Sequence, residues 1–183
     1  MKGIALGRKL FHFSGIIVPL ACLAFGRAFA IGLCAVLLGI CIVLEALRIK
    51  GYIALHVAKD LLKDHEKKRP TGSFFFLLSS LVTLLVFGER HAVPALFVLS
   101  ISDPLSSYVG YYFGKPPFFG KSLPGLLAFF FSTLVILIFF SFPAHAVAIT
   151  AAAAALTEHF SSRYFDDNLS IPIVTALCLS LLA

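Results

Sequence analysis

Charged residues are scarce in this chain. They make up 13% of its 183 residues, and 60% are hydrophobic, whereas ordinary soluble domains carry about 25% charged residues. This composition excludes an ordinary water-soluble domain. No Ser-, Gly- or Pro-rich linker separates the apolar stretches, and we therefore predict one membrane domain over residues 1–183.

Other signals are missing as well. The four cysteines show no CxxC or Cys/His ligand spacing and are interpreted as small packing residues. No small-residue cleavage pattern follows the basic N-terminus, which is interpreted as the start of a retained span. The formal net charge is +6, but the basic residues flank the apolar stretches, where they set topology. We predict no nucleic-acid partner.

The apolar runs predict an all-α integral membrane protein of seven helices. The expected spans are 10–25, 28–46, 73–88, 92–113, 123–142, 144–157 and 169–183. If the N-terminus is cytoplasmic, Arg27 and Arg90 alone of the 15 lysines and arginines lie outside. The positive-inside rule thus predicts a cytoplasmic N-terminus and an outer C-terminus in the cell inner membrane or an equivalent membrane.

Asp103 is the most informative residue, because it falls halfway along the fourth span, where a carboxylate is costly unless it is paired, hydrated or metal-bound. It directly precedes Pro104, and this order predicts a helix broken at that point. Four small residues follow on the same helical face, at +3, +4, +7 and +11. This face could line a polar pocket or form a helix-packing seam; its residues are Ser106, Ser107, Gly110 and Gly114.

Two polar loops could meet phosphate. The segment G-K-P-P-F-F-G-K-S combines lysine heads with unhindered glycine backbone, although lysines in an inner loop also serve topology. The segment K-K-R-P-T-G-S begins the third span, where a helix N-terminus can bind phosphate or simply be capped by Thr71 or Ser73. The candidates are Arg69, Thr71, Gly72, Ser73, Gly114, Lys115, Gly120, Lys121 and Ser122.

Further acids stand at the end of the sixth span and at the start of the seventh. Oxygen-bearing residues of this kind suit Mg²⁺, a hard cation that takes few protein ligands and then binds phosphate. A capping cluster for the last helix is the alternative interpretation. The residues are Glu158, Asp166, Asp167 and Asn168.

In order along the chain, several segments resemble the dolichol kinase, phytol kinase and CTP-dependent diacylglycerol kinase family, which shares its membrane fold with the phosphatidate cytidylyltransferases. The matching segments are R-K-L-F-H (8–12), E-A-L-R (45–48), R-P-T-G-S (69–73), D-P-L-S-S-Y-V-G-Y-Y-F-G-K (103–115), G-K-S (120–122), and Glu158 with D-D-N-L-S-I-P (166–172). One departure stands out: where the family pattern has an acid after the loop lysine, this chain has Pro124.

The resemblance implies transfer of the CTP γ-phosphoryl group to a long-chain lipid alcohol, such as a polyprenol, dolichol, phytol or diacylglycerol, with a divalent metal, Mg²⁺ or Mn²⁺. We expect a site facing the cytoplasm, with Asp103, Asp167 and Lys121 as its catalytic residues. Asp103 and Asp167, with Asp166, Asn168 or Glu158, would hold the metal, while Arg69, Lys115 and Lys121 would bind the triphosphate. The general base is unassigned, and a homodimer is compatible with this interpretation.

Two alternatives stay open. A phosphatidate cytidylyltransferase would release pyrophosphate from the same kind of site, although the chain lacks the C-terminal signature of those enzymes. A small transporter or channel would also suit a mid-membrane carboxylate.

Overall fold

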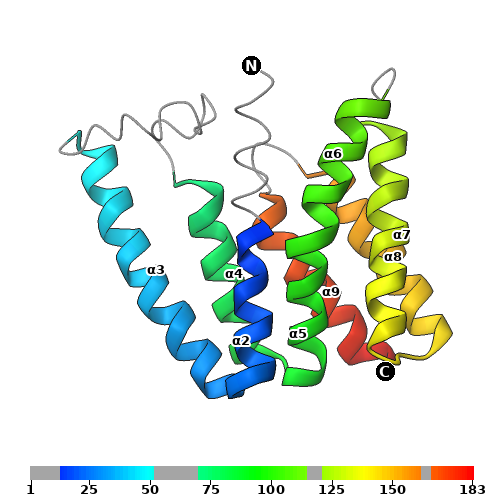
Figure 1. Cartoon of the computed structure of the whole chain (residues 1–183), viewed down its shortest axis with the longest axis horizontal. Helices are drawn as coiled ribbons and strands as arrows, with labels where there is room; N and C mark the ends of the chain where they lie inside the picture. Colours follow the sequence, from blue (N-terminus) through cyan, green and yellow to red (C-terminus); the bar gives the residue numbers. More distant parts are fainter. Residues whose placement is uncertain (1–12, 52–69, 115–120, 162–165) are drawn as a thin grey trace.

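The computed structural model describes residues 13–51, 70–114, 121–161 and 166–183 (Figure 1). Within these ranges the chain forms helices and no β-strand. Because η1 runs into α2, and α5, η3 and α6 follow one another without a break, these ranges contain seven helical segments. Their elements are η1 (Ser14–Ile16), α2 (Ile17–Phe25), α3 (Arg27–Ile49), α4 (Gly72–Val86), α5 (Glu89–Phe97), η3 (Val98–Ser102), α6 (Asp103–Phe113), α7 (Leu123–Phe139), α8 (Ala144–His159) and α9 (Asp167–Leu182).

The predicted all-α class is confirmed, and each predicted helical stretch coincides with one of these segments. The stretch 28–46 corresponds to α3, which extends it by a few residues at its carboxyl end. The stretch 144–157 corresponds to α8, which continues to His159. Apolar runs located these helices well because each run must be covered by protein or lipid along its whole length.

The chain turns sharply between α2 and α3. Gly26 ends α2 with φ of 85°, a conformation that glycine adopts at little cost, and α3 begins at the next residue. The Arg27 side chain then reaches across to α4, where Nε donates to the carbonyl oxygen of Leu84 at 2.6 Å and Nη2 donates to that of Leu85 at 3.0 Å. Arg27 thus satisfies carbonyl groups that the last turn of α4 leaves unpaired.

The predicted break at Asp103 is wrong. Ser102 and Asp103 both have right-handed helical dihedrals, and the helix continues from Glu89 to Phe113. Pro104 lacks an N–H group, and its ring would clash with a carbonyl one turn earlier. The π-helical segment η3 precedes it, and its wider turn accommodates the proline without ending the helix.

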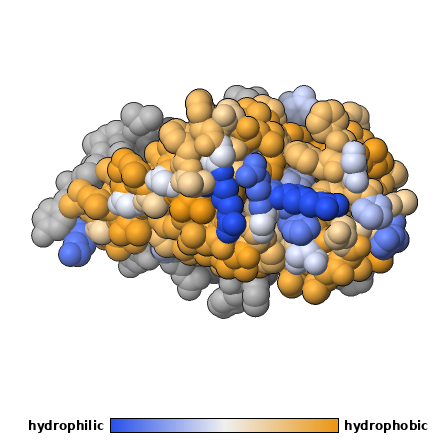
Figure 2. All heavy atoms as spheres, turned by 90° about the horizontal axis from the view of Figure 1, so that it is seen from below, coloured by the Kyte–Doolittle hydropathy of each residue, from blue (hydrophilic) through white to orange (hydrophobic). Residues whose placement is uncertain are grey.

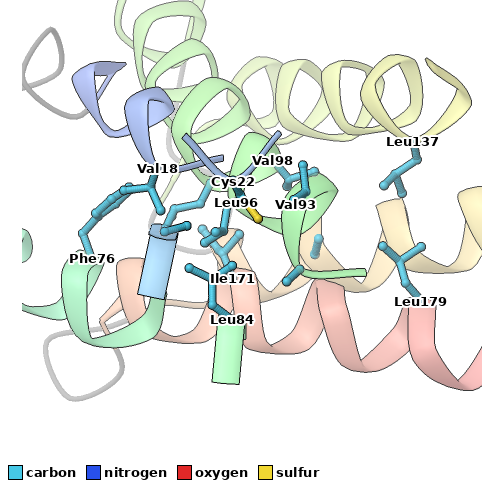
Figure 3. Packing of buried hydrophobic residues seen from close by; sticks show 14 of the residues in the cluster. Val18, Cys22, Phe76, Leu84, Val93, Leu96, Val98, Leu137, Ile171 and Leu179 are labelled. Carbon is cyan, nitrogen blue, oxygen red and sulfur yellow. The ribbon is translucent and has the colours of Figure 1, made fainter. Parts of the chain in front are cut away.

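The helices form an elongated array of roughly upright neighbours (Figure 1). Adjacent pairs include α3 with α4, α4 with α9, α8 with α9, α7 with α8, and α6 with α7. Buried side chains from α2, α3, α4, α5, η3, α7, α8 and α9 form a continuous core, part of which appears in Figure 3. The four cysteines are free, and Cys22 and Cys34 are buried in this core, as their interpretation as packing residues requires.

Among the described residues, two helices are long and apolar enough to cross a membrane: α3 and Glu89–Phe113, with mean hydropathies of 2.6 and 1.3 over an 18-residue stretch. In α3 only 17% of this stretch is buried, whereas in Glu89–Phe113 61% of it is buried. α3 packs mainly on α2 and α4, so that much of its apolar surface is left uncovered. Figure 2, a view of the lower end in Figure 1, shows a hydrophilic band surrounded by apolar surface.

Candidate functional site

A cavity of about 440 Å³ lies between α6, the start of α7 and the end of α8. The four small residues predicted to share one face of the fourth span all lie on its wall, together with Lys121 and Glu158. The structure therefore brings together residues that are separated by up to 52 positions in the chain. The lining consists of Ser106, Ser107, Gly110, Tyr111, Gly114, Lys121, Ser122, Gly125, Leu126 and Glu158.

Glycines allow α6 and α7 to approach closely beside this cavity. A Cβ atom on Gly110 would lie 2.6 Å from Ser122 Oγ, and one on Gly125 would lie 3.4 Å from the Cα of Gly110. Ser122 Oγ in turn accepts a hydrogen bond from the Gly125 N–H at 3.2 Å and caps the start of α7. The packing-seam interpretation and the pocket interpretation of the α6 face are therefore both correct, for the same residues.

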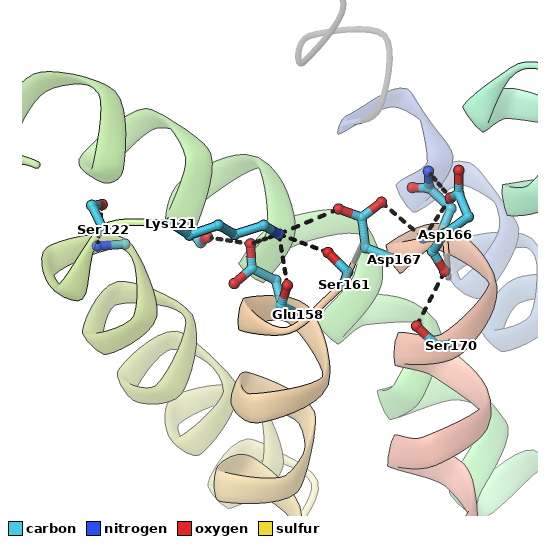
Figure 4. A network of polar contacts seen from close by, with 10 residues as sticks. Lys121, Ser122, Glu158, Ser161, Asp166, Asp167 and Ser170 are labelled. Atoms are coloured by element: carbon cyan, nitrogen blue, oxygen red, sulfur yellow. Dashed lines mark hydrogen bonds and ion pairs between the residues drawn. The ribbon is translucent and has the colours of Figure 1, made fainter. Parts of the chain in front are cut away.

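Lys121 is the centre of the polar network at the cavity (Figure 4). Its Nζ donates to the Glu158 carbonyl oxygen at 2.6 Å, to Glu158 Oε1 at 2.7 Å and to Ser161 Oγ at 2.9 Å, and it lies 3.6 Å from Asp167 Oδ2. Burial lowers the pKa of Lys121, but the negative charges of Glu158, Asp167 and Asp103 outweigh it and raise the pKa above its ordinary value. Lys121 is therefore an ammonium ion at neutral pH.

One carboxylate oxygen of Glu158 links α8 to α6 and to the segment before α7. Its Oε1 accepts hydrogen bonds from Lys121 before α7 and from Ser106 Oγ of α6, the latter at 3.1 Å. Glu158 itself belongs to the last turn of α8 and is 2% exposed. A buried carboxylate is strongly destabilising unless a cation and hydrogen-bond donors surround it, and Lys121 and Ser106 supply both.

The acids beside Lys121 come from distant parts of the chain. This chain has Pro124 three positions after Lys121, where the lipid kinases that its motifs resemble are expected to have an acid. Glu158 and Asp167 lie beside Lys121 in space and provide negative charge from α8 and α9. Lys121 therefore has carboxylate neighbours even though Pro124 stands where an acid is expected.

Asp103 is buried, with 2% exposure, and its negative charge is one of those that favour the ammonium form of Lys121. It is not among the described residues that line the cavity. Among these two acids, the structure thus places Glu158, and not Asp103, in the described wall of the cavity.

The D-D-N segment does three different things. Asp166 Oδ1 accepts hydrogen bonds from the Asn168 backbone N–H at 3.0 Å and its Nδ2 at 2.7 Å, and so caps α9, as the alternative interpretation expected. Asp167 places Oδ2 near Lys121 (Figure 4). Asn168 is 5% exposed, and its carbonyl oxygen accepts a hydrogen bond from Ser79 of α4 at 2.6 Å.

The described residues contain no group of three or more His, Cys, Asp or Glu side chains that could hold a metal ion by themselves. Magnesium, however, is usually held by one or two carboxylates together with substrate phosphates. Glu158 and Asp167 converge on one cation, the Lys121 ammonium. Asp167 is the more accessible of the two, with a side chain 22% exposed against 3% for Glu158.

A second polar cluster ties α3 to the start of α4. Both Nε and Nη2 of Arg48 donate to Glu45 Oε2, and Thr71 Oγ1 donates to Glu45 Oε1 at 2.7 Å. Glu45 and Arg48, three positions apart on α3, thus form an ion pair within the helix. Thr71 occupies the N-cap position of α4, but its hydroxyl binds Glu45 instead of capping the helix.

Some predicted site residues are not brought to the cavity. Gly72 and Ser73 form the first turn of α4 and are not among the described lining residues. Arg69, Lys115 and Gly120 lie outside the described residues.

The sequence interpretation missed Tyr111, Gly125 and Leu126 in the cavity wall and Ser161 beside Lys121. Gly125 follows Lys121 by four positions and lies in the first turn of α7, so its nearness to Lys121 in sequence was a signal for it. Nothing in the sequence singles out Ser161, because its contact depends on the turn after α8.

Neither a protein-family model nor a solved structure matches the chain. It is 28% identical over 172 residues to the uncharacterized protein MJ1137 of Methanocaldococcus jannaschii, covering 91% of this chain and 87% of the relative. It is 30% identical over 187 residues to the uncharacterized protein RP860 of Rickettsia prowazekii, covering 94% of this chain and 91% of the relative. At this identity and coverage, the chain belongs to the same family as the Rickettsia protein.

Proposed function

We propose that the protein is an integral membrane kinase that transfers the γ-phosphoryl group of CTP to a long-chain lipid alcohol. The observation that carries this proposal is the cavity in which a lysine ammonium, a buried carboxylate and a serine- and glycine-rich helix face meet. The order of the sequence motifs supports the same reaction class, since they resemble those of the dolichol and phytol kinases.

Phosphoryl transfer requires charge neutralisation and alignment more than covalent catalysis. Lys121 supplies a cation at the cavity, and α7 begins beside it with Ser122 as its N-cap. A helix N-terminus attracts phosphate through its free N–H groups and its dipole. The glycines of α6 and α7 let the two backbones pack closely against Ser122, which places the start of α7 at the cavity wall.

Asp167 is the residue best placed to hold a magnesium ion brought by the nucleotide. Mg²⁺ keeps several of its waters, and the Asp167 side chain is more exposed than that of Glu158. The bound ion would supply positive charge to the phosphate oxygens. In this proposal the negative charge of Asp103 helps to keep Lys121 protonated, and Asp103 does not contact the nucleotide.

The lipid would reach the site from the apolar periphery. The exposed side chains of α3 include Val36, Ile40 and Val43, which are 63%, 53% and 58% exposed, and lipid tails would cover such a surface. In the proposed orientation the basic loops face the cytoplasm. The Lys121 end of the helices would then open to cytoplasmic nucleotide while the alcohol stays in the bilayer.

The test is a transfer assay with purified protein in lipid nanodiscs. CTP, ATP and GTP labelled at either the α- or the γ-phosphate are offered with a polyprenol, phytol or diacylglycerol, in the presence of Mg²⁺. We expect the γ-label to enter one lipid alcohol, CDP to be released from CTP, and EDTA to stop the reaction.

A matched pair of variants guards against a contaminating kinase. Lys121→Ala should weaken the reaction, whereas Lys50→Ala, which changes an exposed lysine at the end of α3, should leave it unchanged. Entry of the α-label into lipid with release of pyrophosphate would instead identify a cytidylyltransferase. Failure of every lipid to accept either label would leave the kinase proposal without support and favour a transport role.

A further inference from the structure

We propose that Glu158 is the general base, the residue that takes the proton from the lipid hydroxyl as phosphate is transferred. This assignment rests on the proposed kinase function and adds to it the group that the motif resemblance leaves open. Glu158 is the one carboxylate among the described residues that line the cavity. A general base must lie within hydrogen-bond reach of the proton that it removes.

The hydrogen bonds of Glu158 leave one of its oxygens available. Lys121 and Ser106 both donate to Oε1, at 2.7 and 3.1 Å. Oε2 accepts no hydrogen bond from any residue that the structure describes, while Glu158 contributes to the cavity wall. The carboxylate is therefore held in place through one oxygen and offers the other to an occupant of the cavity.

The other nearby acids are placed for different tasks. Asp103 is buried and does not line the cavity. Asp167 has Oδ2 beside Lys121, and its Oδ1 accepts a hydrogen bond from the Asn168 N–H at 3.2 Å. Lys121 is thus the charged group that contacts Glu158, while Asp167 of α9 and Asp103 of α6 act on the same lysine.

The proton transfer and the phosphoryl transfer belong to one displacement at the γ-phosphorus, in which atoms and electrons balance. The hydroxyl oxygen of the alcohol forms a bond to the γ-phosphorus, and the bond from that phosphorus to the β-bridging oxygen breaks. The bonding electron pair leaves on the nucleoside diphosphate, and the hydroxyl proton passes to Glu158 Oε2. The attacking hydroxyl becomes strongly acidic as its new bond forms, so a carboxylate that is paired with an ammonium ion is a sufficient base for a loose transition state.

The decisive variant is Glu158→Gln, because its amide oxygen can still accept the hydrogen bonds of Lys121 and Ser106. Both kcat and KM are measured in nanodiscs. We expect kcat to fall by about 10²-fold or more, as general-base catalysis contributes 10²–10⁴-fold, with KM for CTP and for the lipid changing by less than about threefold.

A metal-binding role for Glu158 predicts a different result. If raising Mg²⁺ or Mn²⁺ restored kcat in Glu158→Gln, the residue would be a metal ligand and the base assignment would be wrong. An unchanged kcat would overturn it equally. A wild-type protein without lipid phosphorylation would remove the proposed function and this assignment together, whereas an active wild type with a normal Glu158→Gln variant removes the assignment alone.

Glu158→Asp keeps the test decisive if the glutamine variant does not fold. Its carboxylate is withdrawn by one methylene group but can still accept a proton, so kcat should fall below that of the wild type while KM for CTP and for the lipid stays nearly unchanged. A wild-type kcat in this variant would contradict a proton transfer that depends on the position of Oε2.

Discussion

At the scale of single residues, Lys121 has no unused donor. Its ammonium group donates to the Glu158 carbonyl oxygen, to Glu158 Oε1 and to Ser161 Oγ, and an ammonium ion has three N–H donors. A phosphate that binds Lys121 must therefore replace one of these acceptors. The neutral Ser161 hydroxyl is the easiest to replace, because hydrogen bonds between charged groups are roughly twice as strong.

We predict that Lys121→Ala raises the KM for CTP by about 10-fold or more, since a hydrogen bond to a charged group contributes about 1.5–3 kcal/mol. The KM for the lipid should change much less. Because neighbouring carboxylates raise the pKa of Lys121, the wild-type KM for CTP should stay constant between about pH 6 and 9. Steady-state kinetics measure both effects.

Lys50→Ala is the control for this measurement, since it removes a lysine charge from an exposed position. A KM for CTP that rises equally in both variants would indicate a general effect of surface charge. Lys121→Ala should also melt at a lower temperature, because it leaves Glu158 buried without its cation, so that kinetics must be compared well below that temperature.

At the scale of helices, the crossing of α6 and α7 makes the cavity wall. Gly110 and Gly125 bring the two backbones together, and the Ser122 cap lies in the contact. The π-helical segment η3 lies just before this crossing. It lets the helix pass Pro104 while keeping Ser106, Ser107 and Gly110 on the same wall.

Gly110→Val should destabilise the protein and reduce its activity. Its Cβ would lie 2.6 Å from Ser122 Oγ, and overpacking of this kind typically costs about 1–3 kcal/mol. The matched control is Gly39→Val in α3, where an added Cβ would meet nothing within 4 Å. Thermal unfolding in detergent should show a lower midpoint for the first variant and a nearly unchanged midpoint for the second; equal shifts would contradict the proposed crossing.

At the scale of the whole molecule, the cavity network and the Glu45 cluster make one end of the helix array polar. Glu45, Thr71, Lys121, Glu158 and Asp167 belong to helix ends that point toward the upper part of Figure 1, and the chain ends at the lower part. Basic residues follow the same division in the sequence, where only Arg27 and Arg90 would lie at the opposite side. The proposed orientation places the polar end in the cytoplasm.

This orientation predicts one-sided labelling of single cysteines in a cysteine-free background. Lys50→Cys, at the upper end of α3, should react with a membrane-impermeant thiol reagent only after cells are permeabilised. Gly88→Cys lies in an exposed turn between α4 and α5 with open space around it, and it should react in intact cells. The reverse pattern would place the proposed nucleotide site outside the cell and would contradict a kinase that uses cytoplasmic CTP.

Much of the fold follows from local properties of the chain. The apolar runs predicted where each helix lies, because hydrophobic length and helical periodicity are properties of neighbouring residues. The face of α6 that carries Ser106, Ser107, Gly110 and Gly114 was predictable for the same reason, since these residues share a helix and a common period. The ion pair of Glu45 with Arg48 is also local, three positions apart on α3.

The tertiary structure alone decided which acid meets Lys121. Glu158 and Asp167 are 37 and 46 positions away in the chain, and their approach depends on how α7, α8 and α9 pack. It also decided that Asp166 caps a helix while Asp167 faces the lysine, and that Pro104 is accommodated by a π-helical turn rather than a break. The sequence by itself determined the helices and the polar character of their ends, because these are local; the partners at the cavity required the packed chain, because hydrogen bonds and ion pairs form between whichever groups the helix contacts bring within reach.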